Sequence, residues 1–138
     1  LWLIPAARVK TRLEHRIPLT DKAITLLSWI DRIEGSEFVF SAPRGGELSD
    51  SAVSGCMKRI HGSTGGKFVD RQSGRLAVPH GLRSTFRDWA AERTDYPRDM
   101  AEIALAHKVG SDVERAYRRG DMLEKRREMM TSWGKFLT

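Results

Sequence analysis

PHGLRSTFRDW, at residues 79–89, is the stretch of sequence that decides the fold. Its apolar residues recur every three or four positions, which is the spacing of an amphipathic helix and not of a strand. The pattern predicts a helix from about residue 80 to 93. The predicted buried face consists of Leu82, Phe86, Trp89 and Ala90. A helix of this length, followed by further helical patterns, indicates a mainly helical domain.

Before this helix, the sequence predicts a small antiparallel sheet. The runs LWLIP at 1–5 and RIPL at 16–19 have the composition of short strands, and the polar, basic stretch between them suits a hairpin. Pro5 and Pro18 fit strand ends, because proline cannot donate to a ladder. FVF at 38–40 is a third candidate strand. The expected fold class is therefore α+β, with the sheet near the N-terminus.

Helix-capping signals place several other helices. Thr20 is suited to begin a helix as its N-cap. Ser111 and Glu114 have the spacing of a capping box, and Asp121 and Glu124 repeat it before the last helix. The apolar face of that last helix consists of Met129, Met130, Trp133, Phe136 and Leu137. This face could dock either on the chain's own core or on another protomer.

Length and composition indicate one domain with a polyanionic partner. With 138 residues, the chain is expected to fold as a single domain spanning residues 1–138. Its net charge of +6 and pI of about 9.9 favour contacts with phosphates. No apolar run approaches the ~20 residues of a membrane span. The single cysteine, Cys56, permits neither an internal disulfide nor a cysteine-based metal site, which suits the reducing cytoplasm.

The predicted helix at 80–93 carries a candidate phosphate-binding group. His80 and Arg83 are three residues apart and share one helix face, and Arg87 joins them one turn later. A guanidinium binds two phosphate oxygens, while a histidine exchanges a proton near neutral pH. The alternative is a cationic, solvent-exposed face with a histidine at the start of the helix.

A second candidate group lies in IALAHKVGSDVERAYRRG, residues 103–120. His107 follows an apolar helix, and Tyr117 lies on the next helix, directly before Arg118 and Arg119. Because a phenol has a pKa of about 10, a tyrosine nucleophile needs a proton acceptor or nearby positive charge. The alternative for Tyr117 is a half-buried packing residue.

Lys10 is a candidate proton donor in the predicted hairpin. It lies in RVKTR, residues 8–12, where a lysine at a hairpin tip can reach into a neighbouring site. The alternative is an exposed hairpin lysine without a chemical role.

The order of these motifs resembles that of the tyrosine recombinase family, in particular the phage integrases of the P4 type. The resemblance rests on VPHGLRSTFRDWAAE, LAHKVG and ERAYRRGDMLEKRREMM, with the hairpin KTR..HRIPL before them. It covers nearly the whole chain. It implies a mainly helical catalytic fold with a small antiparallel sheet, and site-specific DNA recombination that integrates or excises a mobile element.

The resemblance implies a role for each candidate catalytic residue. Tyr117 would attack a DNA phosphodiester and form a 3′-phosphotyrosyl link, while Arg83 would bind the non-bridging oxygens. His80 matches the histidine that takes part in proton transfer around the nucleophile. His107 matches a further hydrogen-bond donor to the phosphate, and Lys10 the lysine that protonates the departing 5′-oxygen. The implied chemistry needs neither a metal nor another cofactor.

The resemblance also implies the partners. The intact enzyme would act as a homo-tetramer on two double-stranded attachment sites, contacting mainly the DNA backbone. The residues expected to contact that backbone are Arg8, Arg12, Arg75, Arg87, Arg118 and Arg119. The family's first catalytic arginine precedes the opening strands and would lie before Leu1. We therefore expect residues 1–138 to be the C-terminal portion of a catalytic domain, inactive or severely impaired by itself.

Two other functions are compatible with parts of the sequence. A non-catalytic DNA-binding module with a recognition helix in the major groove would explain the charge and the helices. A degenerate recombinase could be retained for DNA synapsis or protein contacts. A type IB topoisomerase shares the nucleophile chemistry, and the sequence resembles it less. Only an enzyme of the tyrosine class would trap DNA covalently on Tyr117.

Overall fold

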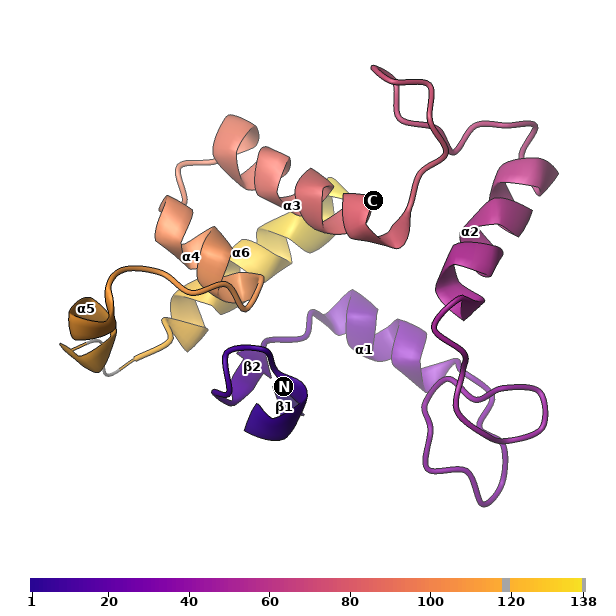
Figure 1. The fold of residues 1–138 in the computed structure, drawn as a ribbon, viewed down its shortest axis with the longest axis horizontal. Coiled ribbons are helices and arrows are strands. Elements are labelled where there is room, and N and C mark those ends of the chain that lie inside the picture. The colour runs from indigo at the N-terminus through magenta and orange to yellow at the C-terminus, as the bar shows by residue number, and fades with distance from the viewer. Residues whose placement is uncertain (118–119, 138) are drawn as a thin grey trace. The chain divides into compact units, whose positions relative to one another are not determined.

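The computed structural model describes residues 1–117 and 120–137, and the chain forms two compact units (Figure 1). Unit 1 combines Leu1–Leu26 with Phe86–Thr138, and unit 2 is Leu27–Thr85. Unit 1 is thus built from both ends of the sequence. The described residues are mostly helical with one two-stranded sheet near the N-terminus, so the predicted α+β class is confirmed.

The two strands of unit 1 form the predicted antiparallel hairpin. β1 (Trp2–Ile4) pairs with β2 (His15–Ile17), the first residue of β1 lying opposite the last residue of β2. Pro5 directly follows β1 and Pro18 directly follows β2. Each strand therefore ends where the backbone loses a hydrogen-bond donor. A short 3₁₀ turn, Ala6–Arg8, begins the connection between them.

Two of the helix starts follow the predicted capping chemistry. The described helices are α1 (Asp21–Ser28), α2 (Ala52–Ser63), α3 (Pro79–Arg93), α4 (Arg98–Ala104), α5 (Asp112–Tyr117) and α6 (Leu123–Phe136). The hydroxyl of Thr20 accepts the backbone N–H of Ala23 at 3.2 Å and caps α1. Before α5, the side chains of Ser111 and Glu114 each accept the other's backbone N–H, which is a capping box. None of the described helices is both long and apolar enough to cross a membrane.

The hydrophobic core of unit 1 is formed by α3, α4 and α6. Its buried residues are Phe86, Trp89, Ala90, Met100, Ala101 and Met129. Trp133 of α6 has its ring centroid 5.0 Å from that of Trp89 and meets Phe86 edge to face. Aromatic rings prefer particular relative orientations, so these contacts stabilise the core beyond the burial of apolar surface. The last helix therefore packs on the chain's own core. Leu82, predicted on the same face of α3, is 61% exposed, because it lies one turn before the first core residue.

A buried arginine joins the hairpin to the start of α6. Arg126 is 1% exposed and donates to the Asp121 carboxylate at 2.6 Å and to the Arg16 carbonyl at 2.7 Å. Arg16 donates to the same carboxylate through Nε and Nη2. Burial raises the pKa of Asp121, but the Arg16 hydrogen bond and the two positive charges outweigh it, so the pKa lies below its ordinary value. The predicted capping role of Asp121 is wrong, because its carboxylate is bound to these arginines, and Met122 occupies the cap position.

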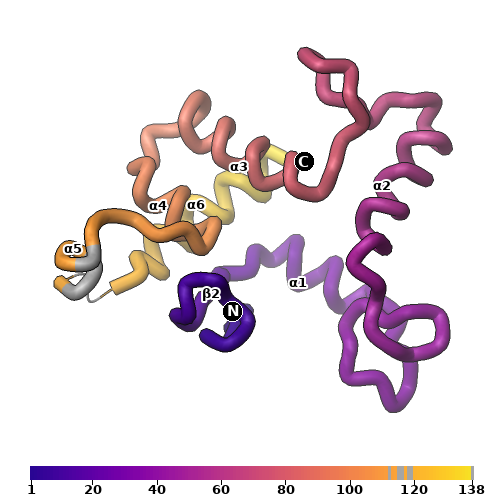
Figure 2. The backbone as a smooth tube through the Cα atoms, viewed as in Figure 1, coloured from indigo at the N-terminus to yellow at the C-terminus, as the bar shows by residue number. Residues whose placement is uncertain are grey.

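Unit 2 contains α2, with long irregular segments before and after it (Figure 2). The predicted strand at 38–40 is wrong, because this segment is irregular. The hydroxyl of Ser36 accepts the N–H of Phe38 and donates to the Gly45 carbonyl. Such local bonds between side chain and backbone compete with strand pairing for the same groups.

Candidate active site

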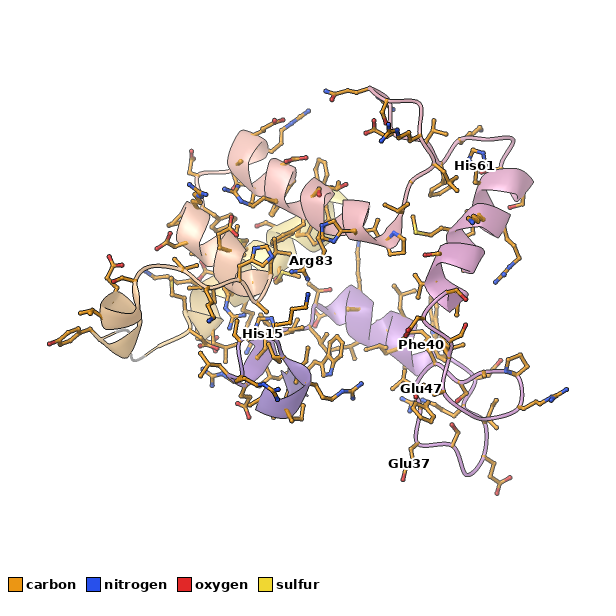
Figure 3. All side chains as sticks on the ribbon, in the orientation of Figure 1. His15, Glu37, Phe40, Glu47, His61 and Arg83 are labelled. Atoms are coloured by element: carbon orange, nitrogen blue, oxygen red, sulfur yellow. The ribbon has the colours of Figure 1, made fainter. Side chains whose placement is uncertain are left out.

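Two predicted catalytic side chains lie at the start of α3. Pro79 begins the helix, where its missing N–H removes no intrahelical hydrogen bond. His80 and Arg83 follow in the first two turns, and both are exposed. Arg83 is labelled in Figure 3. A spacing of three residues places them on one helix face. This accessible face of unit 2 therefore carries a group that exchanges protons and a guanidinium suited to a phosphate.

Arg87, one turn after Arg83, joins α3 to α4. Its Nε donates to Oε1 of Glu102 at 2.7 Å, and both side chains are largely buried. Arg98 lies at the edge of the same pair, with its Nε 4.0 Å from Oε1. Arg87 thus has an intramolecular partner, and its contact with a DNA backbone stays a prediction.

The second oxygen of the same carboxylate binds His107. Nδ1 of His107 lies 2.6 Å from Oε2 of Glu102, and a carboxylate can only accept, so the ring N–H donates. The hydrogen bond from His107, and after it that from Arg87, keeps the pKa of Glu102 below its ordinary value despite partial burial. Glu102 is therefore an anion shared between one arginine and one histidine.

The backbone at the end of α4 brings His107 back to Glu102. Ala106 has a φ of 56°, in the left-handed region. The N–H of His107 donates to the Glu102 carbonyl at 2.9 Å, and that of Ala106 to the Ile103 carbonyl at 3.0 Å. This pair of bonds around a left-handed residue is a Schellman motif. Both the backbone and the side chain of His107 are thus anchored on one residue.

An open cleft of about 560 Å³ in unit 1 has walls from the hairpin and from the segment after α4. Its polar lining includes Thr11, Glu14, His15, Arg16, His107 and Lys108. Nε2 of His15, on β2, lies 3.2 Å from the Ala104 carbonyl at the end of α4 (Figure 3). The cleft therefore has a histidine on each wall. Its charged lining is mixed: Arg16 and Lys108 are positive, Glu14 and Asp121 are negative, and Arg16 is paired with Asp121.

Lys10 is exposed on the hairpin loop, one residue before Thr11 of the cleft wall. Arg12, at φ 58°, turns the loop back toward β2. Arg8 and Arg12 are exposed on this loop, and Arg75 is exposed in unit 2. All four predicted cationic side chains are therefore accessible to a large ligand.

Tyr117 is the last residue of α5 and is 83% exposed. The alternative interpretation of Tyr117 as a packing residue is therefore wrong. Among the described residues, those that line the cleft do not include Tyr117. Arg118 and Arg119, predicted to bind DNA, lie outside the residues that the structure describes.

Comparison with known proteins identifies the family. Residues 1–124 match the model of the phage integrase family. The chain belongs to this family. Prophage integrase IntA of Escherichia coli (strain K12) is 36% identical over 135 residues, which cover 96% of this chain and 30% of that relative. The integrase of Shigella phage Sf6 is 34% identical over 138 residues, covering 97% and 33%.

This phage integrase chain is also similar to the integrase of Enterobacteria phage P4, with 26% identity over 153 residues that cover 99% of the chain and 33% of the relative. The chain thus spans about a third of the length of the curated relatives it matches. No solved structure shows significant similarity to it.

The sequence did not indicate two residues of this site: His15, which lines the cleft, and Glu102, which binds His107. Glu102 precedes His107 by five residues, and a Schellman motif joins residues at this separation by a backbone hydrogen bond. The sequence does not indicate the motif, because its left-handed position is usually glycine and here it is Ala106. The contact of His15 with Ala104 spans 89 residues of sequence, so no local pattern could indicate it.

Proposed function

We propose that this phage integrase chain is the C-terminal portion of the catalytic domain of a site-specific DNA recombinase. The observation that carries the proposal is the anchoring of His107 by Glu102 at a cleft whose opposite wall is the hairpin with Lys10. Membership of the phage integrase family and the exposure of Tyr117 support it further. The proposed reaction integrates or excises a mobile element.

The proposed reaction is a transesterification. The phenolic oxygen of Tyr117 attacks the phosphorus of a DNA phosphodiester, and the bond from phosphorus to the 5′-oxygen breaks. The phenolic proton passes to His80, and Lys10 gives a proton to the departing 5′-oxygen. The product is a 3′-phosphotyrosyl link and a free 5′-hydroxyl. Attack by a 5′-hydroxyl from a second DNA restores a phosphodiester and releases Tyr117.

Two further side chains would stabilise the charge of the transition state. Arg83 binds the non-bridging oxygens through its planar, forked donors, and His107 donates one more hydrogen bond. Such donors act most strongly when they are held in place before the reaction. The bonds of His107 to Glu102 satisfy that requirement within unit 1.

The proposed partner is double-stranded DNA. The intact protein would bind two attachment sites as a homo-tetramer, in the cytoplasm. The exposure of Arg8, Arg12 and Arg75 supports contacts with the DNA backbone. We propose that Arg87, Arg118 and Arg119 also contact the DNA backbone.

The proposal is tested with a nicked attachment-site duplex that traps the covalent intermediate. The protein is extended before Leu1 to the length of its relatives, so that it includes the family's first catalytic arginine. We expect a protein–DNA band on a denaturing gel, which Tyr117→Phe abolishes because it removes the attacking oxygen. The 138-residue chain is expected to give little or no band.

The control for this experiment is Tyr96→Phe. Tyr96→Phe removes the other tyrosine hydroxyl, which contacts Ser132, and should leave the band in place. Specific binding by the extended protein without any covalent band would reject the enzymatic proposal and favour a non-catalytic or degenerate DNA-binding module.

A further inference from the structure

We infer that Glu102 is a positioning residue for the proposed transesterification: it orients His107 so that one ring nitrogen donates to Glu102 and the other to the scissile phosphate. The inference rests on the proposed function and adds a residue outside its catalytic set. In this role, the carboxylate of Glu102 determines which ring nitrogen of the phosphate-binding His107 carries a hydrogen atom.

The geometry fixes the ring through two separate bonds to one residue. The backbone N–H of His107 is 2.9 Å from the Glu102 carbonyl, and Nδ1 is 2.6 Å from Oε2. A side chain tied at both points loses much of its rotational freedom before any ligand arrives. Catalytic groups that are already oriented avoid this entropic cost during the reaction.

The chemistry of the carboxylate then decides the position of the hydrogen. Because Glu102 accepts only, Nδ1 of His107 carries a hydrogen atom whenever this bond is made. The nitrogen that would reach a phosphate is therefore Nε2. For Nε2 to donate to a bound phosphate, the ring takes up one proton from water and becomes an imidazolium with an anion at each edge. Without Glu102, the hydrogen bond that holds Nδ1 is lost.

Arg87 keeps the carboxylate in place for this role. It occupies Oε1 at 2.7 Å, which leaves Oε2 to His107. The partly buried pair also joins α3 to α4, with the Arg87 and Glu102 side chains 26% and 20% exposed. The hydrogen bonds from His107 and Arg87 hold the pKa of Glu102 below its ordinary value, so it stays an anion with both oxygens available as acceptors near neutral pH.

A purely structural role would have different consequences. If Glu102 only joined α3 to α4, its removal would lower stability but leave the hydrogen position on His107 unchanged. Its effect on DNA cleavage would also add to that of His107→Ala, since independent sites give additive effects. Both differences are measurable.

The first test observes the ring directly, by ¹⁵N NMR of the histidine side chains in the 138-residue chain. The signals of His107 are assigned by their loss in His107→Ala. We expect a hydrogen on Nδ1 in the wild type and a shift toward the Nε2–H tautomer in Glu102→Ala, because the acceptor of Nδ1 is removed. Glu102→Leu, which is of similar size and has no acceptor, serves if the alanine variant does not fold.

The matched control is Glu124→Ala. Glu124 also forms an ion pair with an arginine, at 3.0 Å to Arg127, but on the exposed surface of α6. It should leave the His107 spectrum unchanged. A folded Glu102→Ala or Glu102→Leu variant with an unaltered His107 tautomer would overturn the inference.

The second test measures the rate of covalent complex formation by the extended protein. Loss of one transition-state donor costs about 100-fold or more, so this is expected of His107→Ala. Glu102→Ala should cost roughly tenfold, since it leaves the donor present but less well oriented. The double variant should be no slower than His107→Ala, because Glu102 acts through His107.

The outcomes separate this inference from the proposed function. Additive losses in the double variant, or cleavage by Glu102→Ala at the wild-type rate, would overturn the positioning role while Tyr117-dependent cleavage stands. A wild-type extended protein that forms no covalent band would overturn the proposed function, and the positioning role with it, whatever the NMR spectra show.

Discussion

Arg126 is the buried charge on which the start of α6 depends. It is 1% exposed and satisfies the Asp121 carboxylate together with the carbonyls of Asp121 and Arg16. Without Arg126 the carbonyls of Asp121 and Arg16 lose their buried donor, and the Asp121 carboxylate keeps its bonds to Arg16. Arg126→Ala should therefore lower the free energy of unfolding by about 3 kcal/mol. Arg127→Ala, which removes only a surface ion pair with Glu124, should cost less than about 1 kcal/mol. Urea unfolding of the 138-residue chain measures both changes. Equal decreases in the free energy of unfolding would show that the buried network stabilises the chain no more than the surface ion pair does.

The C-terminal end of α4 carries strain that glycine would relieve. Ala106 is held at φ 56° by the Schellman motif that anchors His107. A left-handed residue with a side chain costs about 1–2 kcal/mol, and part of the gain from glycine is lost to the entropy of the unfolded chain. Ala106→Gly should therefore stabilise the chain by roughly 0.5 kcal/mol, seen as a higher Tm.

The control for that change is Ala91→Gly, on the exposed side of the regular helix α3. There glycine should destabilise by about 1 kcal/mol, because it only adds freedom to the unfolded chain. A lower Tm for Ala106→Gly, equal to that of Ala91→Gly, would mean that the left-handed conformation carries no strain.

Across the whole chain, the net charge of +6 predicts DNA binding that weakens steeply with salt. Each phosphate contact releases about one counterion, so Arg75→Ala should reduce the slope of log affinity against log salt by about one. Fluorescence anisotropy with a labelled duplex measures this slope for the 138-residue chain. Arg127→Ala removes the same charge from a residue already paired with Glu124 and should leave the slope unchanged. Equal slopes for Arg75→Ala and the wild type would remove Arg75 from the DNA-contacting set.

The local elements of this phage integrase could be predicted from the sequence, because their causes are local. The helical spacing of Phe86 and Trp89 placed α3, and the Ser111–Glu114 box placed α5. The order of motifs identified the family and named the candidate catalytic residues. The error at Asp121 has a tertiary cause: the residue has the spacing of a cap, yet its carboxylate binds Arg16, which is 105 residues away in the sequence, and the buried Arg126. The error at residues 38–40 has a local cause, the hydrogen bonds of the Ser36 hydroxyl.

Sequence by itself thus determined the α+β class, the hairpin and the family, since periodicity and capping depend on neighbours a few residues away. It placed Phe86, Trp89 and Met129 on buried helix faces correctly, but Leu82 and Leu137, predicted on the same faces, are 61% exposed. Only the tertiary structure decided that Glu102 divides its two oxygens between Arg87 and His107. The physical reason is that a carboxylate pairs with whatever donor the packing of α3 on α4 brings within 3 Å, and that packing depends on the whole core.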